Sequence, residues 1–178
     1  MSESTSSKHA QFFSGEQLSV EEFKLEQQYL REKLRRHNRS LHGFGIVSGL
    51  RVSVNAGQIL VEPGLALDCE GNELLIETVQ AIVPATTVNW HTAYLNIRYL
   101  EQCAGASSGD GAPDAFGLTV GREGFELAVG QENLNRGHRH LRARWLACEQ
   151  PHALTVAKLR YGPHGWRIDK GYRAPQIK

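Results

Sequence analysis

The chain has 178 residues, 40% of them hydrophobic and 22% charged, which suits one globular domain or one domain with a helical appendage. Its formal net charge is only +1, so we expect no binding to nucleic acid, whose affinity for proteins depends on an excess of basic contacts. The three cysteines (Cys69, Cys103 and Cys148) form no CxxC pair, which argues against a zinc ribbon and a disulfide framework. No apolar run reaches the roughly 18 residues of a membrane span, and the polar N-terminus does not resemble a secretory signal. We therefore expect synthesis in the cytoplasm and no membrane insertion.

A helix is predicted near the N-terminus, after a polar segment (1–11) that we expect to be disordered. Ser19 and Glu22 have the spacing of a capping box, and no glycine or proline interrupts the chain from Val20 to Asn38. An approximately sevenfold apolar seam, with Gln27 in its middle, runs along an otherwise charged surface and comprises Phe23, Leu30, Leu34 and, past the helix end, Leu41. Residues 12–40 are thus predicted to be an amphipathic helical region, with the seam available for protein contacts.

From residue 41 onward the apolar residues recur with a period of two, which is typical of β-strands. The runs with this pattern are 45–54, 58–67, 72–83, 92–100, 125–129, 153–161 and 166–169. Turn residues separate several of these runs: Asn55-Ala56-Gly57, Glu70-Gly71-Asn72 and Gly162-Pro163-His164-Gly165. Pro63-Gly64, inside the run 58–67, is expected to mark a further hairpin turn. Residues 104–117 are expected to be a flexible loop, and 131–150 fits either a loop or a short helix. The predicted fold is α+β and mainly β, with the helix packed on an antiparallel sheet, sandwich or barrel formed by residues 41–178.

The segment Leu41-His42-Gly43-Phe44-Gly45 is the densest candidate for catalysis, because His-Gly openings occur in loops that donate backbone N–H groups to an oxyanion. The pattern G-x-S-x-G occurs only at Gly105-Ala106-Ser107-Ser108-Gly109, inside the stretch expected to be a flexible loop, and neither this match nor Ser48 has a strand-turn-helix setting. We therefore favour a structural corner in which the glycines permit a sharp turn from helix to strand. The residues assigned to it are His42, Gly43, Gly45, Gly49, Pro63, Gly64, Asp68 and Gly71.

A metal site is the second chemical alternative. His138, His140, Cys148 and His152 are weak candidates, since their spacing matches no standard zinc pattern and neighbouring arginines would repel a cation. We predict no metal and no cofactor.

The carboxylates Asp68, Glu70 and Glu73 cluster at one turn and suggest acid–base catalysis only weakly. We expect Asp68 instead to accept backbone N–H groups of that turn, as Asx turns do. Trp90, Trp145 and Trp166 are candidate anchors for protein contacts.

The order of several motifs resembles a family of small proteins and N-terminal modules encoded with contractile phage tails and phage-like injection systems. The resemblance covers about residues 12–101, with two shorter matches at 122–127 and 169–173. Its motifs include Phe13-Ser14-Gly15-Glu16-Gln17-Leu18-Ser19, Glu26-Gln27-Gln28-Tyr29, Arg36-His37-Asn38-Arg39-Ser40-Leu41-His42-Gly43, Gly45-Ile46-Val47-Ser48-Gly49-Leu50-Arg51-Val52, Val61-Glu62-Pro63-Gly64-Leu65-Ala66-Leu67-Asp68, Gly71-Asn72-Glu73-Leu74 and Ala93-Tyr94-Leu95-Asn96-Ile97-Arg98-Tyr99. This chain has Phe44 where many relatives have Trp, and Ser48 where a Cys is common.

The resemblance implies a tail-fibre or baseplate-associated structural component and supplies no catalytic residues. We therefore expect a non-enzymatic structural or adaptor protein that becomes part of a virion-like or injection particle. Its expected partners are other tail or baseplate proteins and further copies of itself. The alternatives are a metal-dependent or Ser/His hydrolase and a carbohydrate-binding module that uses the tryptophans.

Overall fold

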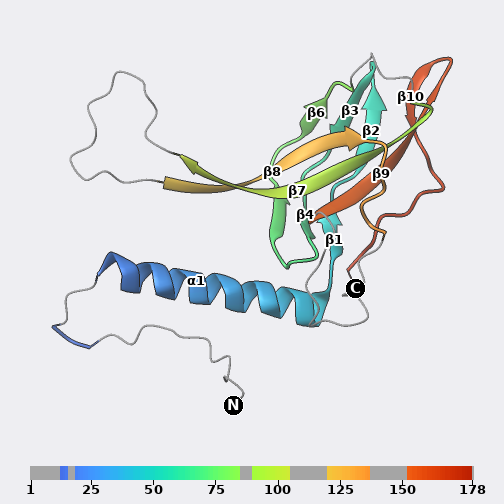
Figure 1. The fold of residues 1–178 in the computed structure, drawn as a ribbon. Helices are drawn as coiled ribbons and strands as arrows, with labels where there is room; N and C mark the ends of the chain where they lie inside the picture. The colour runs from blue at the N-terminus through green and yellow to red at the C-terminus, as the bar shows by residue number, and fades with distance from the viewer. Residues whose placement is uncertain (1–12, 16–18, 85–89, 105–119, 137–151, 178) are drawn as a thin grey trace, which may run out of the picture.

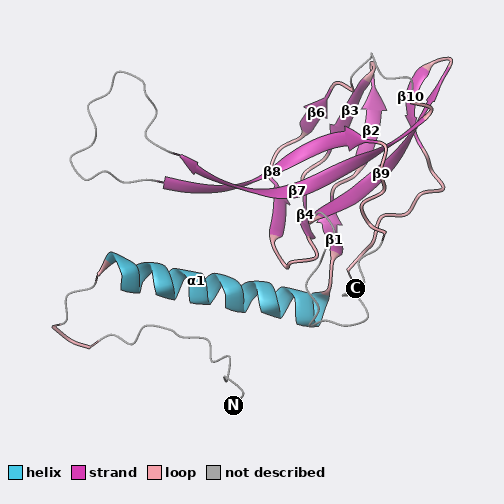
Figure 2. Ribbon diagram, in the orientation of Figure 1, coloured by secondary structure: helices cyan, strands magenta, loops and turns pink. Residues whose placement is uncertain are grey.

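Helix α1 runs over Val20–His37, one residue short of the predicted end, and a single π-helical turn, η1 (Asn38–His42), continues it. Ten strands follow within the part of the chain that this computed structural model describes, which comprises residues 13–15, 19–84, 90–104, 120–136 and 152–177. The helix lies along one side of a β-domain (Figures 1 and 2). The expected fold class, mainly β with one N-terminal helix, is confirmed.

Three antiparallel sheets make up the β-domain. The first contains β1 (Gly45–Gly49), β4 (Gly64–Leu67) and β5 (Glu73–Ile76), and the second contains β2 (Val52–Asn55), β3 (Gln58–Val61) and β6 (Gln80–Ile82). The third has the order β10-β9-β7-β8 and contains β10 (Gly165–Ile168), β9 (Ala153–Gly162), β7 (Thr92–Ala104) and β8 (Val120–Gly130). One hydrophobic cluster joins the three sheets, and its fully buried members include Ile59, Val61, Leu74, Ile76, Leu95, Ile97, Leu154 and Leu159.

The first two sheets share one long hairpin that bends at a corner. β2 and β3 meet at Ala56-Gly57, whose positive φ angles of 47° and 80° suit a two-residue hairpin turn. Beyond the bend the same two chain segments pair again as β1 and β4. Leu50 has a φ of 53° at the bend, where a Cβ on Gly49 would lie only 2.1 Å from the carbonyl oxygen of Pro63. Strands commonly pass from one sheet to another through such bends.

This geometry corrects the predicted hairpin turn at Pro63-Gly64, which instead lies between β3 and β4 in two different sheets. The runs 45–54, 58–67 and 72–83, each predicted as one strand, are two strands apiece. A period of two continues on both sides of the bend, and alternation alone therefore does not reveal it.

A buried polar network attaches the segment after β8 to the third sheet. The side-chain amide of Asn135 donates to the Thr155 carbonyl oxygen at 2.7 Å and to the Tyr172 hydroxyl at 2.8 Å, and its oxygen accepts the Thr155 N–H at 2.8 Å. The fully buried Thr155 hydroxyl donates to Asn96 Oδ1 at 2.6 Å, beside a register shift between Leu95 and Asn96. The network satisfies backbone groups that the irregular ladder leaves open.

β7 and β8 continue beyond the third sheet as a two-stranded arm. β9 pairs with β7 only as far as Arg98, whereas β7 and β8 remain paired to Ala104 and Val120. The arm projects past the body of the domain on the same side as α1 (Figure 1). The expected disordered N-terminus (1–11), nearly all of the expected loop at 104–117 and most of the 131–150 segment lie outside the described residues.

Candidate protein-binding site

The capping box expected from the sequence defines the start of α1. The Glu22 N–H donates to Ser19 Oγ at 3.2 Å, and the Ser19 N–H donates to Glu22 Oε2 at 2.9 Å. The backbone hydrogen bond from Ser19 lowers the pKa of Glu22, because it stabilises the charged carboxylate. The helix therefore begins at a fixed residue, which sets the direction in which every later side chain points.

An apolar seam runs along α1 and remains open to solvent. The side chains of Phe23, Leu30 and Leu34 are 54%, 55% and 51% exposed, and Val20 at the helix start is 63% exposed. No residue of α1 is buried. The spacing of these positions, with Gln27 between Phe23 and Leu30, alternates between three and four residues, as in helices that pack on another helix.

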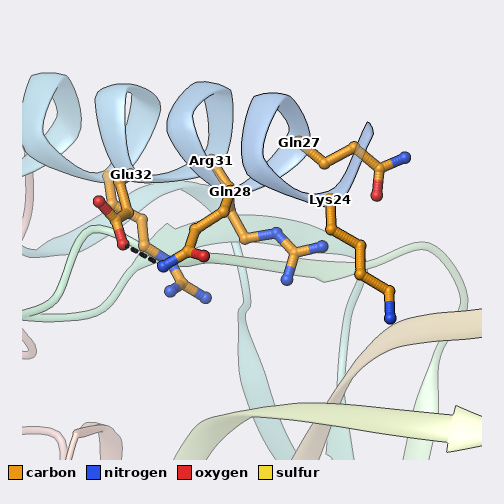
Figure 3. Close-up of a pocket in the computed structure, with 6 residues that line it drawn as sticks. Lys24, Gln27, Gln28, Arg31 and Glu32 are labelled. Atoms are coloured by element: carbon orange, nitrogen blue, oxygen red, sulfur yellow. Dashed lines mark hydrogen bonds between the residues drawn. The ribbon is translucent and has the colours of Figure 1, made fainter. Parts of the chain in front are cut away.

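A different flank of α1 faces the β-domain. Because successive residues are rotated by about 100° around the helix axis, this flank lies roughly a quarter-turn from the seam. Arg31 forms a 2.7 Å ion pair with Glu101 of β7, and the guanidinium of Arg35 lies 5.7 Å from the centre of the Tyr99 ring. This flank lines a cavity of about 350 Å³, and Figure 3 shows its side chains extending from the helix. The lining residues are Lys24, Gln27, Gln28, Arg31, Glu32 and Arg35. The helix thus contacts its own domain through charged side chains, and the seam is left exposed.

The C-terminal end of α1 is fixed to the turn between β4 and β5. The buried side chain of Asn38 donates to the Gly71 carbonyl oxygen at 3.0 Å. Gly71 has a φ of 88°, and a Cβ there would lie 2.2 Å from the Arg35 carbonyl oxygen. Only glycine permits both this backbone conformation and this approach.

Glycines also shape the corner between η1 and β1. Gly43 and Gly45 have φ angles of 81° and 142°, and a Cβ on Gly45 would lie 2.8 Å from the carbonyl oxygen of Pro175. That carbonyl accepts the Ile46 N–H at 2.8 Å, so the segment around residue 176 extends the β1 edge as a parallel bridge. His42 at this corner is exposed, with its ring centre 5.3 Å from that of His37.

Asp68 organises the turn between β4 and β5. Its Oδ1 accepts the N–H groups of Glu70 and Asn72 at 2.8 and 2.9 Å, and its Oδ2 accepts the Asn72 side-chain amide at 2.7 Å. Asp68 is 1% exposed, and burial raises the pKa of its carboxyl group despite these hydrogen bonds. All three donors belong to the turn itself, which is the Asx-type role expected from the sequence.

Two of the three tryptophans lie in the described residues, and the side chains of both are only partly exposed. Trp90 and Trp166 are half-buried against the hydrophobic core, and the Trp166 ring meets that of Tyr161 edge to face at 5.1 Å. Part of each side chain remains open to solvent, and the role of Trp90 and Trp166 as anchors for protein contacts stays a prediction. Trp145 lies outside the described residues.

One polar cluster was missed at the sequence level. The Cys69 Sγ atom lies 3.1 Å from His152 Nδ1, and His152 Nε2 lies 2.9 Å from Glu70 Oε1. The sequence pattern groups His152 with His138, His140 and Cys148, and these three lie outside the described residues. Within the described segments no group of three or more potential ligands is placed to hold a metal ion, and no helix is long and apolar enough to cross a membrane.

Comparison with known proteins finds similarity in structure only: no family model and no curated protein matches. A chain of the TssK-TssF-TssG baseplate subcomplex of the type VI secretion system superposes with a TM-score of 0.56 and 10% identity, over 95% of this chain and 62% of that chain. This chain shares the fold of part of that baseplate chain. A chain of the type VI secretion baseplate complex gives a TM-score of 0.58 and 10% identity, over 96% of this chain and 42% of that one. The crystal structure of TssK superposes with a TM-score of 0.55 and 15% identity, over 96% of this chain and 43% of that chain.

This chain therefore spans less than two-thirds of the length of the baseplate chains that it matches. At identities of 10% to 15%, the similarity establishes the fold and does not transfer partners or activity.

Proposed function

We propose that the chain is a non-enzymatic structural subunit of a contractile, phage-tail-like particle, located at the baseplate or at a fibre attachment. The observation that carries this proposal is the open apolar seam on α1, in a chain that has the fold of baseplate proteins. An apolar stripe on a helix whose other flank already contacts its own domain is typical of a surface that another protein covers. Other baseplate or tail proteins are the proposed partners of the assembled subunit.

We further propose that a second copy of the chain covers the seam. The alternation of three and four residues along Val20, Phe23, Gln27, Leu30 and Leu34 is the pattern of two helices that pack side by side. In a parallel pair, Gln27 of each copy would face the other, and the amides would hydrogen-bond only in that register. Symmetric self-association also suits a particle built from repeated subunits.

The amount of apolar side-chain surface that the seam exposes indicates how strong this association is. Complete burial of one Leu, Val or Phe side chain stabilises by about 1.5–3 kcal/mol, and each of the four apolar seam residues is about half exposed. Covering the seam therefore contributes about 3–6 kcal/mol per copy, against roughly 4–15 kcal/mol for the loss of freedom on association. We expect weak, concentration-dependent self-association of the isolated chain, which further contacts in a particle would strengthen.

The test compares the solution mass of the wild-type chain with that of Leu30→Ser/Leu34→Ser by sedimentation at several concentrations. The matched control is Lys24→Ser/Gln28→Ser, which changes the flank that lines the cavity and leaves the seam intact. We expect the mass to rise with concentration for the wild type and the control, and to remain monomeric for the seam variant. A monomer at every concentration, or equal association of both variants, would refute the role of the seam.

A further inference from the structure

The cluster of Cys69, His152 and Glu70 connects two distant parts of the chain. Cys69 and Glu70 belong to the turn after β4, whereas His152 precedes β9, 83 residues after Cys69. Cys69 carries a thiol and is 4% exposed; the side chains of His152 and Glu70 are 34% and 41% exposed. The imidazole thus lies between a buried thiol and a carboxylate that solvent reaches.

The contacts determine where the imidazole carries its proton. A carboxylate only accepts hydrogen bonds, so the 2.9 Å contact with Glu70 requires the proton of a neutral ring to be on Nε2. Nδ1 then presents its lone pair to the Cys69 thiol at 3.1 Å. This is the arrangement in which a histidine removes the proton of a nucleophile while an acid orients the ring and stabilises its charged form.

Charged groups of both signs lie around the cluster. Glu70 lines a cavity of about 290 Å³ together with Glu32, Arg35, Arg36 and Arg39, so cations outnumber anions there. The Asp68 carboxylate, directly before Cys69 in the chain, acts in the opposite direction, because its hydrogen bonds to neutral donors of the turn leave its negative charge in place. Because these charges act in both directions, activation of the thiol depends on its contact with His152 and on the contact of His152 with Glu70.

From this geometry we infer that Cys69 is a modification site, a thiol activated by His152 and Glu70 for oxidation by hydroperoxides. Cys69 transfers its proton to His152 Nδ1, and the thiolate attacks one peroxide oxygen. The O–O bond breaks as the S–O bond forms, and the departing hydroxide takes the proton back from the imidazolium to give water. Sulfur is oxidised by two electrons to a sulfenic acid, and the peroxide is reduced. The burial of Cys69 limits the oxidant to a small molecule.

This inference is independent of the proposed particle, and its test uses the intact chain. The wild type is exposed to hydrogen peroxide at several pH values and quenched with catalase. It is then unfolded in dimedone, which traps sulfenic acids, and the adduct at Cys69 is quantified by peptide mass spectrometry. An ordinary thiol is only about 3% ionised at pH 7, so complete ionisation would raise the thiolate fraction, and with it the reaction rate, by up to about thirtyfold. We expect Cys69 at pH 6.5 to react about tenfold faster than the unperturbed thiol of a short peptide.

The variants separate activation from a merely structural role. His152→Gln removes the proton acceptor and should lower the rate at pH 6.5 about tenfold, with a smaller loss in Glu70→Gln. The matched controls Glu73→Gln, at the same turn, and His164→Gln, in the turn between β9 and β10, should leave the rate unchanged. If His152→Gln does not fold, as judged by circular dichroism, the wild-type pH profile decides alone. A Cys69 rate no faster than that of the peptide thiol at pH 6.5, or one that His152→Gln leaves unchanged, overturns the inference.

Discussion

Replacement of Asp68 by alanine tests how the turn between β4 and β5 is held. The substitution removes the acceptor of two backbone N–H groups, those of Glu70 and Asn72, and of the Asn72 side-chain amide. A buried donor left without an acceptor costs about 1–3 kcal/mol. With the Asn72 N–H buried and that of Glu70 partly buried, we expect Asp68→Ala to lower the free energy of unfolding by about 3–5 kcal/mol.

Asp68→Asn is the matched control, because it keeps one oxygen for the two backbone donors. Asn72 Oδ1 is buried and meets no donor in the part of the chain that the structure describes. When the Asn72 amide turns over, that oxygen can accept from the new amide at position 68. We therefore expect Asp68→Asn to change the free energy of unfolding by no more than about 1 kcal/mol.

Urea denaturation followed by circular dichroism measures both variants, and amide hydrogen exchange at Glu70 and Asn72 localises the effect. A cost below about 1 kcal/mol for Asp68→Ala would show that the hydrogen bonds do not hold the turn. An equal cost in both variants would show that the negative charge, rather than the acceptor geometry, is what matters.

Three further predictions follow from the same contacts. Because burial raises the pKa of Asp68, the folded chain binds the carboxyl proton more tightly than the unfolded chain does. The stability that this proton contributes is fully present below about pH 4 and is lost as the pH rises through the pKa of the folded state. Urea denaturation at a series of pH values should show this decline in the wild type and not in Asp68→Asn. Gly71→Ala should lower the free energy of unfolding by at least about 2 kcal/mol, measured by thermal unfolding, because the new Cβ would meet the Arg35 backbone. Gly57 also has a positive φ but has open space around it, so Gly57→Ala should lower the same free energy by only about 1 kcal/mol. Asn135→Ala breaks three hydrogen bonds to Thr155 and Tyr172 and should lower the free energy of unfolding by about 2–4 kcal/mol. Asn133→Ala loses the bond from the Asn135 N–H at 3.1 Å and a side-chain hydrogen bond with Tyr172, and should cost less, about 1–2 kcal/mol, in the same urea assay.

Local features of the fold could be predicted from the sequence because their causes are local. The capping box at Ser19 and Glu22 sets the start of α1, and the Asx role of Asp68 involves residues within four positions of it. The closing hairpin between β9 and β10 likewise has its turn residues beside its strands. In each case the physical reason for the structure is contained in one short segment.

Features that depend on distant residues could not be predicted in this way. Strand alternation does not show that Leu50 and Pro63 meet at a bend between two sheets. Nothing in local spacing connects Cys69 with His152, whose contact exists because the turn after β4 lies beside the start of β9. The seam on α1 could be recognised from its period, but its exposure could not, because that depends on which flank of the helix contacts the arm.

The most direct test of the proposed function is whether the chain is part of a contractile particle. Sheathed particles are purified on a density gradient from the organism that carries the gene, and the chain is quantified by mass spectrometry relative to the sheath protein. We expect a fixed ratio of chain to sheath across the particle fractions, with a clear loss of the chain from these fractions in Leu30→Ser/Leu34→Ser and not in Lys24→Ser/Gln28→Ser. Particles with intact sheath that contain no wild-type chain would contradict the proposal.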